Sequence, residues 1–402
     1  MPTQSGIWNL KQVRDGIAGA LYVQQPLIDS ITGDIGGVQS TLTISGVAFG
    51  LLEGTVRFTS GATFADVTVT PASDVSMTVN VPQAIYDLAT GSTVGIKFIT
   101  GLGVQSNTFN KTVSNFAVSF LVIAGGGSGG HGTPGNGGGG GAGGYRSSVS
   151  GESSGGLSPS ETPLAFGSGS TATVTIGAGG ASVGNAQNGN KGFNSLFSTI
   201  TSEGGGYGSH YLQAGGPGGS GGAAGQGGPF NPGGTATANQ GFDGGSTPPS
   251  GGNNSGCGGG GAGEIGETAT LGSGIAGDGG DGISSSITGS AVPRGGGGGG
   301  SGHLPNAGRG LGGNGGGGDG QNNRDPAQPA VAGSVNTGGG GGGTGEGQGV
   351  SGAGGSGVVI IKYPDTVTVT NSGGGLVFST PAAAGGFKVT TFTSGTGTIE
   401  LN

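Results

Sequence analysis

Few residues in this chain could carry out chemistry, and they lie far apart. Its three histidines, His131, His210 and His303, form no HExxH motif, and none has a second His at ligand spacing. The single cysteine, Cys257, has no partner for an internal disulfide. Glycine is so abundant that GxGxxG matches arise from composition alone, and the Gly-Lys dipeptide of the phosphate-binding P-loop never occurs. We therefore predict a protein that is not an enzyme and has no metal site and no cofactor.

The acidic residues leave two weaker alternatives open. Residues 277–283 read GDGGDGI and resemble a calcium-binding nonapeptide repeat, but Ser284 occupies the position of the ligating Asp and no tandem copy follows. Glu264 and Glu267, or the two Asp of 277–283, could approach each other as paired acids for glycan hydrolysis. Exposed turn carboxylates without a catalytic or ligating role are the favoured interpretation of both patterns.

Aromatic residues inserted between glycines carry more information than the charged ones. A ring at an exposed turn offers a flat apolar face to a sugar or a protein loop, and Tyr and His add a polar edge. A bulky side chain cannot enter closely packed glycine strands without separating their backbones, so these residues belong at edges or tips. Packing that caps the ends of the strands is the alternative for any one of them. As a group we interpret them as candidate receptor contacts: Tyr207, His210, Tyr211, Phe230, Phe242 and His303.

The elements that must position these residues are set by the glycine distribution. Of 402 residues 110 are Gly, and 89 of these lie among the 244 residues from 120 to 363. Collagen would need Gly at every third position with plentiful Pro, and the register here slips. A flexible linker would not need the strand-like apolar segments that punctuate the runs, such as 120–124, 173–176 and 358–363. We therefore predict an ordered glycine-rich domain over residues 119–364.

An array of extended left-handed helices would satisfy such a sequence. The polyproline II conformation has three residues per turn, rises roughly 3.1 Å per residue and leaves each N–H and C=O without a partner in its own strand. Neighbouring strands must then supply the partners, and Gly allows it because no Cβ holds the backbones apart. One such helix would not hold alone, whereas a cooperative bundle of polyglycine II helices could.

The segments on either side follow different patterns. Residues 1–26 carry the stripe of a short amphipathic helix, which we predict docks the protein on a larger assembly through Trp8, Leu10, Val13, Ile17 and Leu21. Apolar residues alternate from 27 to 118, as in Leu42-Thr43-Ile44-Ser45, which predicts an antiparallel β-sandwich. The same alternation in 365–402 predicts strands that close the array or extend a sheet. The predicted fold class is mainly β and irregular.

Two resemblances add to this picture. Ile31-Thr32-Gly33 and then the stretch 42–50, LTISGVAFG, look like the opening of IPT/TIG immunoglobulin-like domains. The blocks 120–127, 139–146, 174–180 and 355–364 follow the order seen in glycine-rich domains of bacteriophage tail-fibre and adhesin proteins of the polyglycine-helix type. That resemblance implies a virion protein whose inter-helix loops contact a host surface glycan or outer-membrane protein, and whose other partners are phage tail or virion proteins. This sequence departs from that pattern at both ends.

Composition excludes several classes. The formal net charge is −8 with only 8% charged residues, which is unlike the basic footprint of a nucleic-acid binder. No segment predicts a signal peptide or membrane insertion. The resemblance to tail-fibre proteins implies an extracellular protein that is carried in a virion tail or fibre. A structural virion decoration without receptor binding is the alternative, and an ice-binding protein is a less favoured third hypothesis because no regular Thr or Ala ladder appears. A homo-oligomer stays open.

Overall fold

The computed structural model describes residues 24–401 apart from 34, 36–40, 87, 89–90, 114, 168–169, 229, 250–253, 273, 304–307, 323–324, 326, 346–348 and 366. The chain divides into two compact units, one up to Ala117 and one from Val118 onward. The N-terminal helix predicted around Trp8, Leu10, Val13, Ile17 and Leu21 lies outside the described residues.

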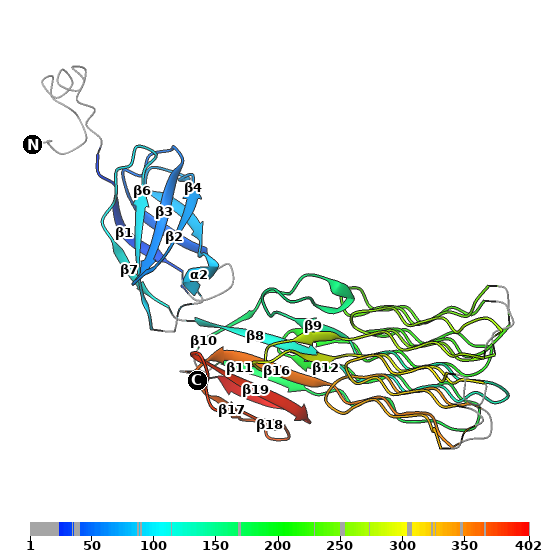
Figure 1. The fold of residues 1–402 in the computed structure, drawn as a ribbon. Coiled ribbons are helices and arrows are strands. Elements are labelled where there is room, and N and C mark those ends of the chain that lie inside the picture. Colours follow the sequence, from blue (N-terminus) through cyan, green and yellow to red (C-terminus); the bar gives the residue numbers. More distant parts are fainter. Residues whose placement is uncertain are drawn as a thin grey trace, which may run out of the picture. The chain divides into compact units, whose positions relative to one another are not determined.

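The first unit is a sandwich of two antiparallel sheets (Figure 1). One sheet contains, in order, β1 (Leu27–Thr32), β2 (Thr41–Val47) and β5 (Ser76–Asn80). The other has the order β4 (Thr63–Val69), β3 (Gly54–Ser60), β6 (Thr93–Ile99) and β7 (Phe109–Thr112). A single helical turn, α2 (Gln83–Tyr86), follows β5. The order matches that of a constant-type immunoglobulin sandwich except that β4 pairs with β3 rather than with β5.

Side-chain alternation explains this sandwich. Ile44 on β2, Met77 on β5 and Phe58 on β3 point into one shared core and are fully buried, while their sequence neighbours are more exposed. The rings of Phe49 and Phe98 meet edge to face in the same core, with centroids 5.6 Å apart. The period of two read from the sequence is therefore confirmed as β structure.

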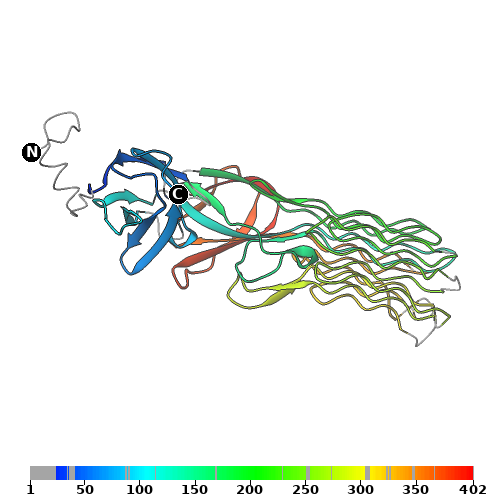
Figure 2. The same cartoon turned by 90° about the horizontal axis from the view of Figure 1, so that it is seen from above.

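The second unit has a base of strands, drawn from two larger sheets and one hairpin (Figures 1 and 2). The six-stranded sheet consists of β8 (Asn115–Ile123), β9 (Tyr145–Ser147), β10 (Leu164–Gly167), β16 (Val358–Pro364), β18 (Val377–Ser379) and β19 (Phe387–Ser394). The five-stranded sheet consists of β11 (Ser170–Thr175), β12 (Ser195–Phe197), β13 (Ile200–Ser202), β17 (Val369–Asn371) and β20 (Thr396–Leu401). The hairpin pairs β14 (Ile283–Ser285) with β15 (Val292–Arg294), and a 3-10 turn, η1 (Gly155–Leu157), follows β9. The two sheets pack through Phe120 and Phe166 against Phe197.

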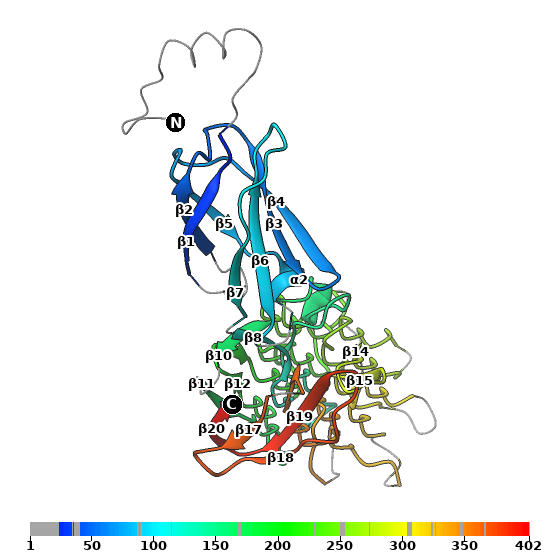
Figure 3. The same cartoon turned by 90° about the vertical axis from the view of Figure 1, so that its left-hand side faces the viewer.

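Beyond the base, the glycine runs lie side by side as a bundle of extended strands, seen lengthwise in Figures 1 and 2 and turned by 90° in Figure 3. Their hydrogen bonds repeat every three residues. The N–H groups of Gly126 and Gly129 donate to Gly355 and Gly352, those of Gly127 and Gly130 donate to Gly141 and Gly138, and those of Gly125, Ser128 and His131 donate to Phe193, Asn190 and Gln187. Each strand therefore pairs with several neighbours in rotation, which is the arrangement predicted for polyglycine II helices.

Close approach makes Gly obligatory along these runs. A Cβ added to Gly140 would overlap the carbonyl oxygen of Gly127, and one added to Gly126 would overlap that of Gly339, each far inside the 3.0 Å that real Cβ atoms keep. Backbones at this spacing exclude every other residue type. The positions that hold Ala, Ser or aromatic residues must therefore face gaps, edges or turns.

The C-terminal segment belongs to the base. Strand β19 pairs antiparallel with β16, and β20 pairs antiparallel with β11, so both predicted roles of residues 365–402, closing the array and extending a sheet, are combined. In the part of the chain that the structure describes, helices are too short to span a membrane.

Candidate functional site

The end of the bundle away from the base is built from turns. The chain leaves β8 at Ile123, turns at 131–136 and returns through 137–144 to β9. It leaves β11 at Thr175, turns at 185–188 and returns to β12. It then leaves β13, turns at 210–214, and makes a further turn at 226–232. We call these four turns the distal turns.

Hydrogen bonds tie the distal turns together. The N–H of His131 donates to the carbonyl of Gln187, that of Leu212 to Gln226, and that of Gln226 to Asn136, at 2.7–2.9 Å. The N–H of His210 donates to Asn188 Oδ1 at 2.8 Å. Segments up to about 90 residues apart in sequence are thus held as one surface.

Asn136 is the centre of this network and was not singled out from the sequence. Its side chain is fully buried; Nδ2 donates to Gln226 Oε1 at 2.9 Å and to the carbonyl of Asn254 at 2.7 Å, and Oδ1 accepts from Ser301 Oγ at 2.9 Å. A Pro-Gly-Asn-Gly sequence indicates a turn. Nothing in it indicates which other turns the Asn will join.

Apolar and aromatic side chains cover this network. Leu212 is 48% exposed and Phe230 is 53% exposed. The side chain of Leu212 lies over Gly227. Tyr211 is half-buried with its ring against Gly135. His210 is half-buried, and the nearby His131 is only 5% exposed. The distal turns therefore present rings and an aliphatic side chain on a support that is already hydrogen-bonded.

The electrostatics of the distal turns rest on the two histidines. Burial, and secondarily the nearby charge that His131 can carry, lowers the pKa of His210 below its ordinary value. His210 Nδ1 lies 2.7 Å from the carbonyl oxygen of Tyr211, so that nitrogen carries the proton and donates it. The neutral imidazole is therefore the form that this surface favours.

The structure brings only some of the predicted contact residues together. His210, Tyr211 and Phe230 lie in the distal turns. Tyr207 lies midway along its run with its ring packed on Gly216. Phe242 lies near the base, two residues after Gln240, whose carbonyl accepts from the N–H of Tyr145 on β9. His303 lies outside the distal turns and donates its N–H to the carbonyl of Gly274.

The acidic residues of the sequence analysis extend the bundle's own hydrogen bonding. Asp278 Oδ1 accepts from the N–H of Leu311 at 2.6 Å, and Asp281 Oδ1 accepts from the N–H of Asn314 at 2.7 Å. Both pairs are spaced by three residues, so the carboxylates continue the repeat at an exposed edge. Among the described residues, no three His, Cys, Asp or Glu side chains are grouped so that they could hold a metal ion.

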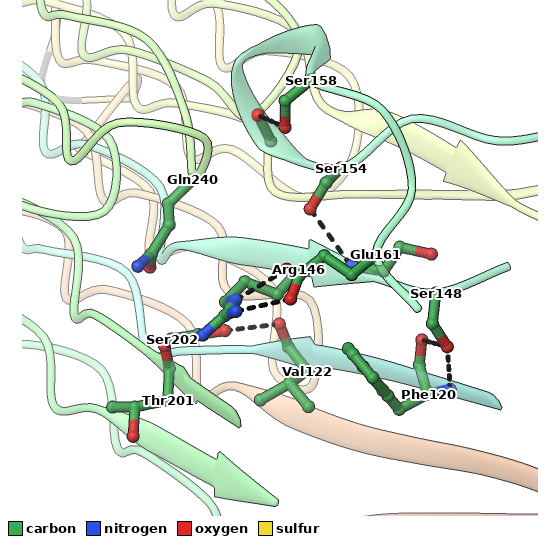
Figure 4. Close-up of polar contacts among 12 residues, drawn as sticks. Phe120, Val122, Arg146, Ser148, Ser154, Ser158, Glu161, Thr201, Ser202 and Gln240 are labelled. Atoms are coloured by element: carbon green, nitrogen blue, oxygen red, sulfur yellow. Dashed lines mark hydrogen bonds and ion pairs between the residues drawn. The ribbon is translucent and has the colours of Figure 1, made fainter. Parts of the chain in front are cut away.

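A second polar cluster lies at the base and has a structural explanation (Figure 4). Arg146 on β9 makes a two-pronged ion pair with Glu161, with Nε to Oε1 at 2.7 Å, and its Nη1 donates to the carbonyl of Thr201 at 3.1 Å. Ser202 Oγ donates to the carbonyl of Val122 on β8. Glu161 neutralises the charge of Arg146, and the bonds of the guanidinium join three segments of the base.

Cys257 is buried in the bundle. Burial raises the pKa of its thiol to about 11, and Sγ lies 3.4 Å from the carbonyl oxygen of Ser246. It therefore stays protonated at neutral pH and acts as a small packing residue.

A family model described as a glycine-rich domain matches residues 103–364. The chain belongs to the glycine-rich domain family. No curated protein and no solved structure matches it. In this glycine-rich protein the family match spans β7 to β16, and so includes all the distal turns.

Proposed function

We propose that this glycine-rich protein is a bacteriophage tail-fibre or adhesin protein, and that its distal turns recognise a receptor on the host cell surface. The observation that carries the proposal is the convergence of four turns on Asn136 and its neighbours at one end of an ordered bundle, with Leu212 and Phe230 exposed on top. A surface that is ordered before contact loses little entropy on binding.

The chemistry of the distal turns suits an uncharged partner surface. Residues 131–136, 185–188, 210–214 and 226–232 contain no Asp, Glu, Lys or Arg. Attachment would then depend on apolar burial and uncharged hydrogen bonds. We therefore expect adsorption to change less than threefold between 50 and 500 mM NaCl, because salt screens only charged contacts.

The test compares virions that carry two double variants. Leu212→Ala with Phe230→Ala removes exposed side chains from the distal turns. Leu311→Ala with Val331→Ala removes exposed aliphatic side chains, 53% and 43% exposed, from runs outside these turns. We expect the first pair to reduce adsorption to the propagating strain at least tenfold, since an anchor at an interface centre contributes about 2 kcal/mol, and the second pair to have no effect.

Equal adsorption by both double variants would count against the proposal and favour a structural virion protein. Folding is checked by thermal unfolding of the purified proteins. Both pairs should melt within a few degrees of the parent because all four side chains are exposed.

Attachment to the particle belongs to the same proposal but to another segment. The stripe Leu10, Val13, Ile17 and Leu21 with Trp8 has more apolar surface than a short helix needs. Removing residues 1–22 should give a soluble protein that no longer joins the virion. Normal incorporation of the shortened chain would assign attachment to another segment.

A further inference from the structure

A groove of about 650 Å³ lies on the flank of the glycine-rich unit, next to the base and apart from the distal turns. It is lined where the chain leaves β11 and where it enters β12, by Thr175, Gly177, Lys191, Phe193 and Asn194 among others. Its volume lies within the range of small-ligand sites, about 300–1,000 Å³.

The ring of Phe193 is the main apolar surface of the groove. It is 64% exposed, although the backbone of the same residue is fully engaged: its N–H donates to Ala178 and its carbonyl accepts from Gly125. The ring is thus carried on a fixed strand of the bundle. A rigid support of this kind is what a binding residue needs to hold its geometry.

Hydrogen-bonding groups flank the ring. Lys191 Nζ is 3.8 Å from Glu203 Oε2, too long for a hydrogen bond, so its N–H groups stay available while the carboxylate offsets its charge. Asn194 Oδ1 accepts from the N–H of Gly204 at 2.9 Å, which turns its amide into a fixed donor at an exposed position. The groove therefore combines one aromatic face with two side-chain hydrogen-bond donors, Lys191 and Asn194.

The charges and the exposed ring of the groove suit an uncharged ligand with an apolar face. Two backbone donors in its floor are already used, because the N–H of Gly177 donates to Ser195 Oγ and that of Gly192 donates to the carbonyl of Gly205. The ion pair offers no net charge to an anion. A sugar ring has an apolar face for Phe193 and hydroxyls for Lys191 and Asn194.

We propose that this groove binds an uncharged hexose chain, as a carbohydrate site separate from the distal turns. The probes are maltohexaose, cellohexaose and mannohexaose, observed by saturation-transfer NMR with the full-length protein. We expect at least one to bind the parent, Phe193→Ala to weaken that binding at least tenfold, and Phe193→Trp to restore it through a larger aromatic face.

Two controls separate this proposal from the proposed function. Phe64→Ala removes a ring that is 65% exposed in the first unit and should leave binding unchanged, as should Leu212→Ala with Phe230→Ala. The proposal is overturned if no probe binds the parent, or if Phe193→Ala binds as the parent does. Either result leaves the adsorption experiment on the distal turns unaffected.

Discussion

At the scale of single residues, side chains in the bundle replace missing backbone partners. Ser128 Oγ accepts from the N–H of Asn190 at 2.8 Å, and Ser209 Oγ accepts from that of Gly225 at 2.7 Å. Asp278 and Asp281 do the same at an edge. Small polar residues therefore enter the glycine runs where a strand has a donor left over, which accounts for acids and hydroxyls that motif searches would assign to metal or catalysis.

The titration of His210 is a residue-scale prediction. Its pKa is lowered in the folded protein, so the unfolded chain binds more protons there as the pH falls below about 6.5, and acid should weaken the distal turns. NMR titration of the imidazole should give a midpoint below that of the urea-unfolded protein. His131→Asn should raise the His210 midpoint toward the ordinary value by removing a neighbouring charge. A folded midpoint at or above the unfolded one would contradict this.

At the scale of elements, the sequence predicts the local conformation of a segment well, but it predicts poorly which segments lie next to each other. Alternation in 42–45 marks β2, and glycine runs such as 137–141 mark polyglycine strands, because both follow from local geometry. The grouping of the aromatic residues does not follow. Phe242 lies near the base while Phe230 lies in a distal turn, since the direction of each run depends on how many turns precede it. The groove that contains Phe193 forms where residues 175–178 meet residues 191–194, and neither sequence has a pattern that predicts this meeting.

The spacing of the glycine strands gives an element-scale prediction. Gly140→Ala places a methyl group into the carbonyl of Gly127 and should cost about 3 kcal/mol or more, because backbone must move. Gly184→Ala is the matched control. Its Cβ would have ordinary contacts at 3.6 Å with Val350 and 3.7 Å with Gly349. Denaturant unfolding measures both, and equal stabilities would contradict close packing as the reason for glycine.

At the scale of the whole molecule, sequence-distant segments close the base. Strand β8 pairs with β16, more than 230 residues later, and the last strand, β20, pairs with β11. Several of the described bundle strands run from this frame to the turns at the far end, or back from those turns to the frame. The second unit is therefore expected to fold as one cooperative body rather than run by run.

Removing the C-terminal strands tests this cooperativity. A chain that stops after Asp365 lacks β19 and β20, which leaves β16 and β11 as open edges and uncovers buried Val359 and Ile361. Open apolar edges associate, so we expect the shortened protein to aggregate. Size-exclusion chromatography and thermal unfolding measure the outcome. A soluble monomer with parental cooperativity would show that residues 366–402 are dispensable.

The three-residue repeat also determines which insertions and deletions a run can accept. One residue inserted into a run turns every later residue by a third of a helical turn, so each N–H would face the wrong neighbour. Three inserted residues add one full helical turn, so each N–H again faces its original neighbour, and the run becomes roughly 9 Å longer. Changes within a turn shift no run at all. Natural variants of this protein should therefore differ freely in their turns, and in their runs only by multiples of three.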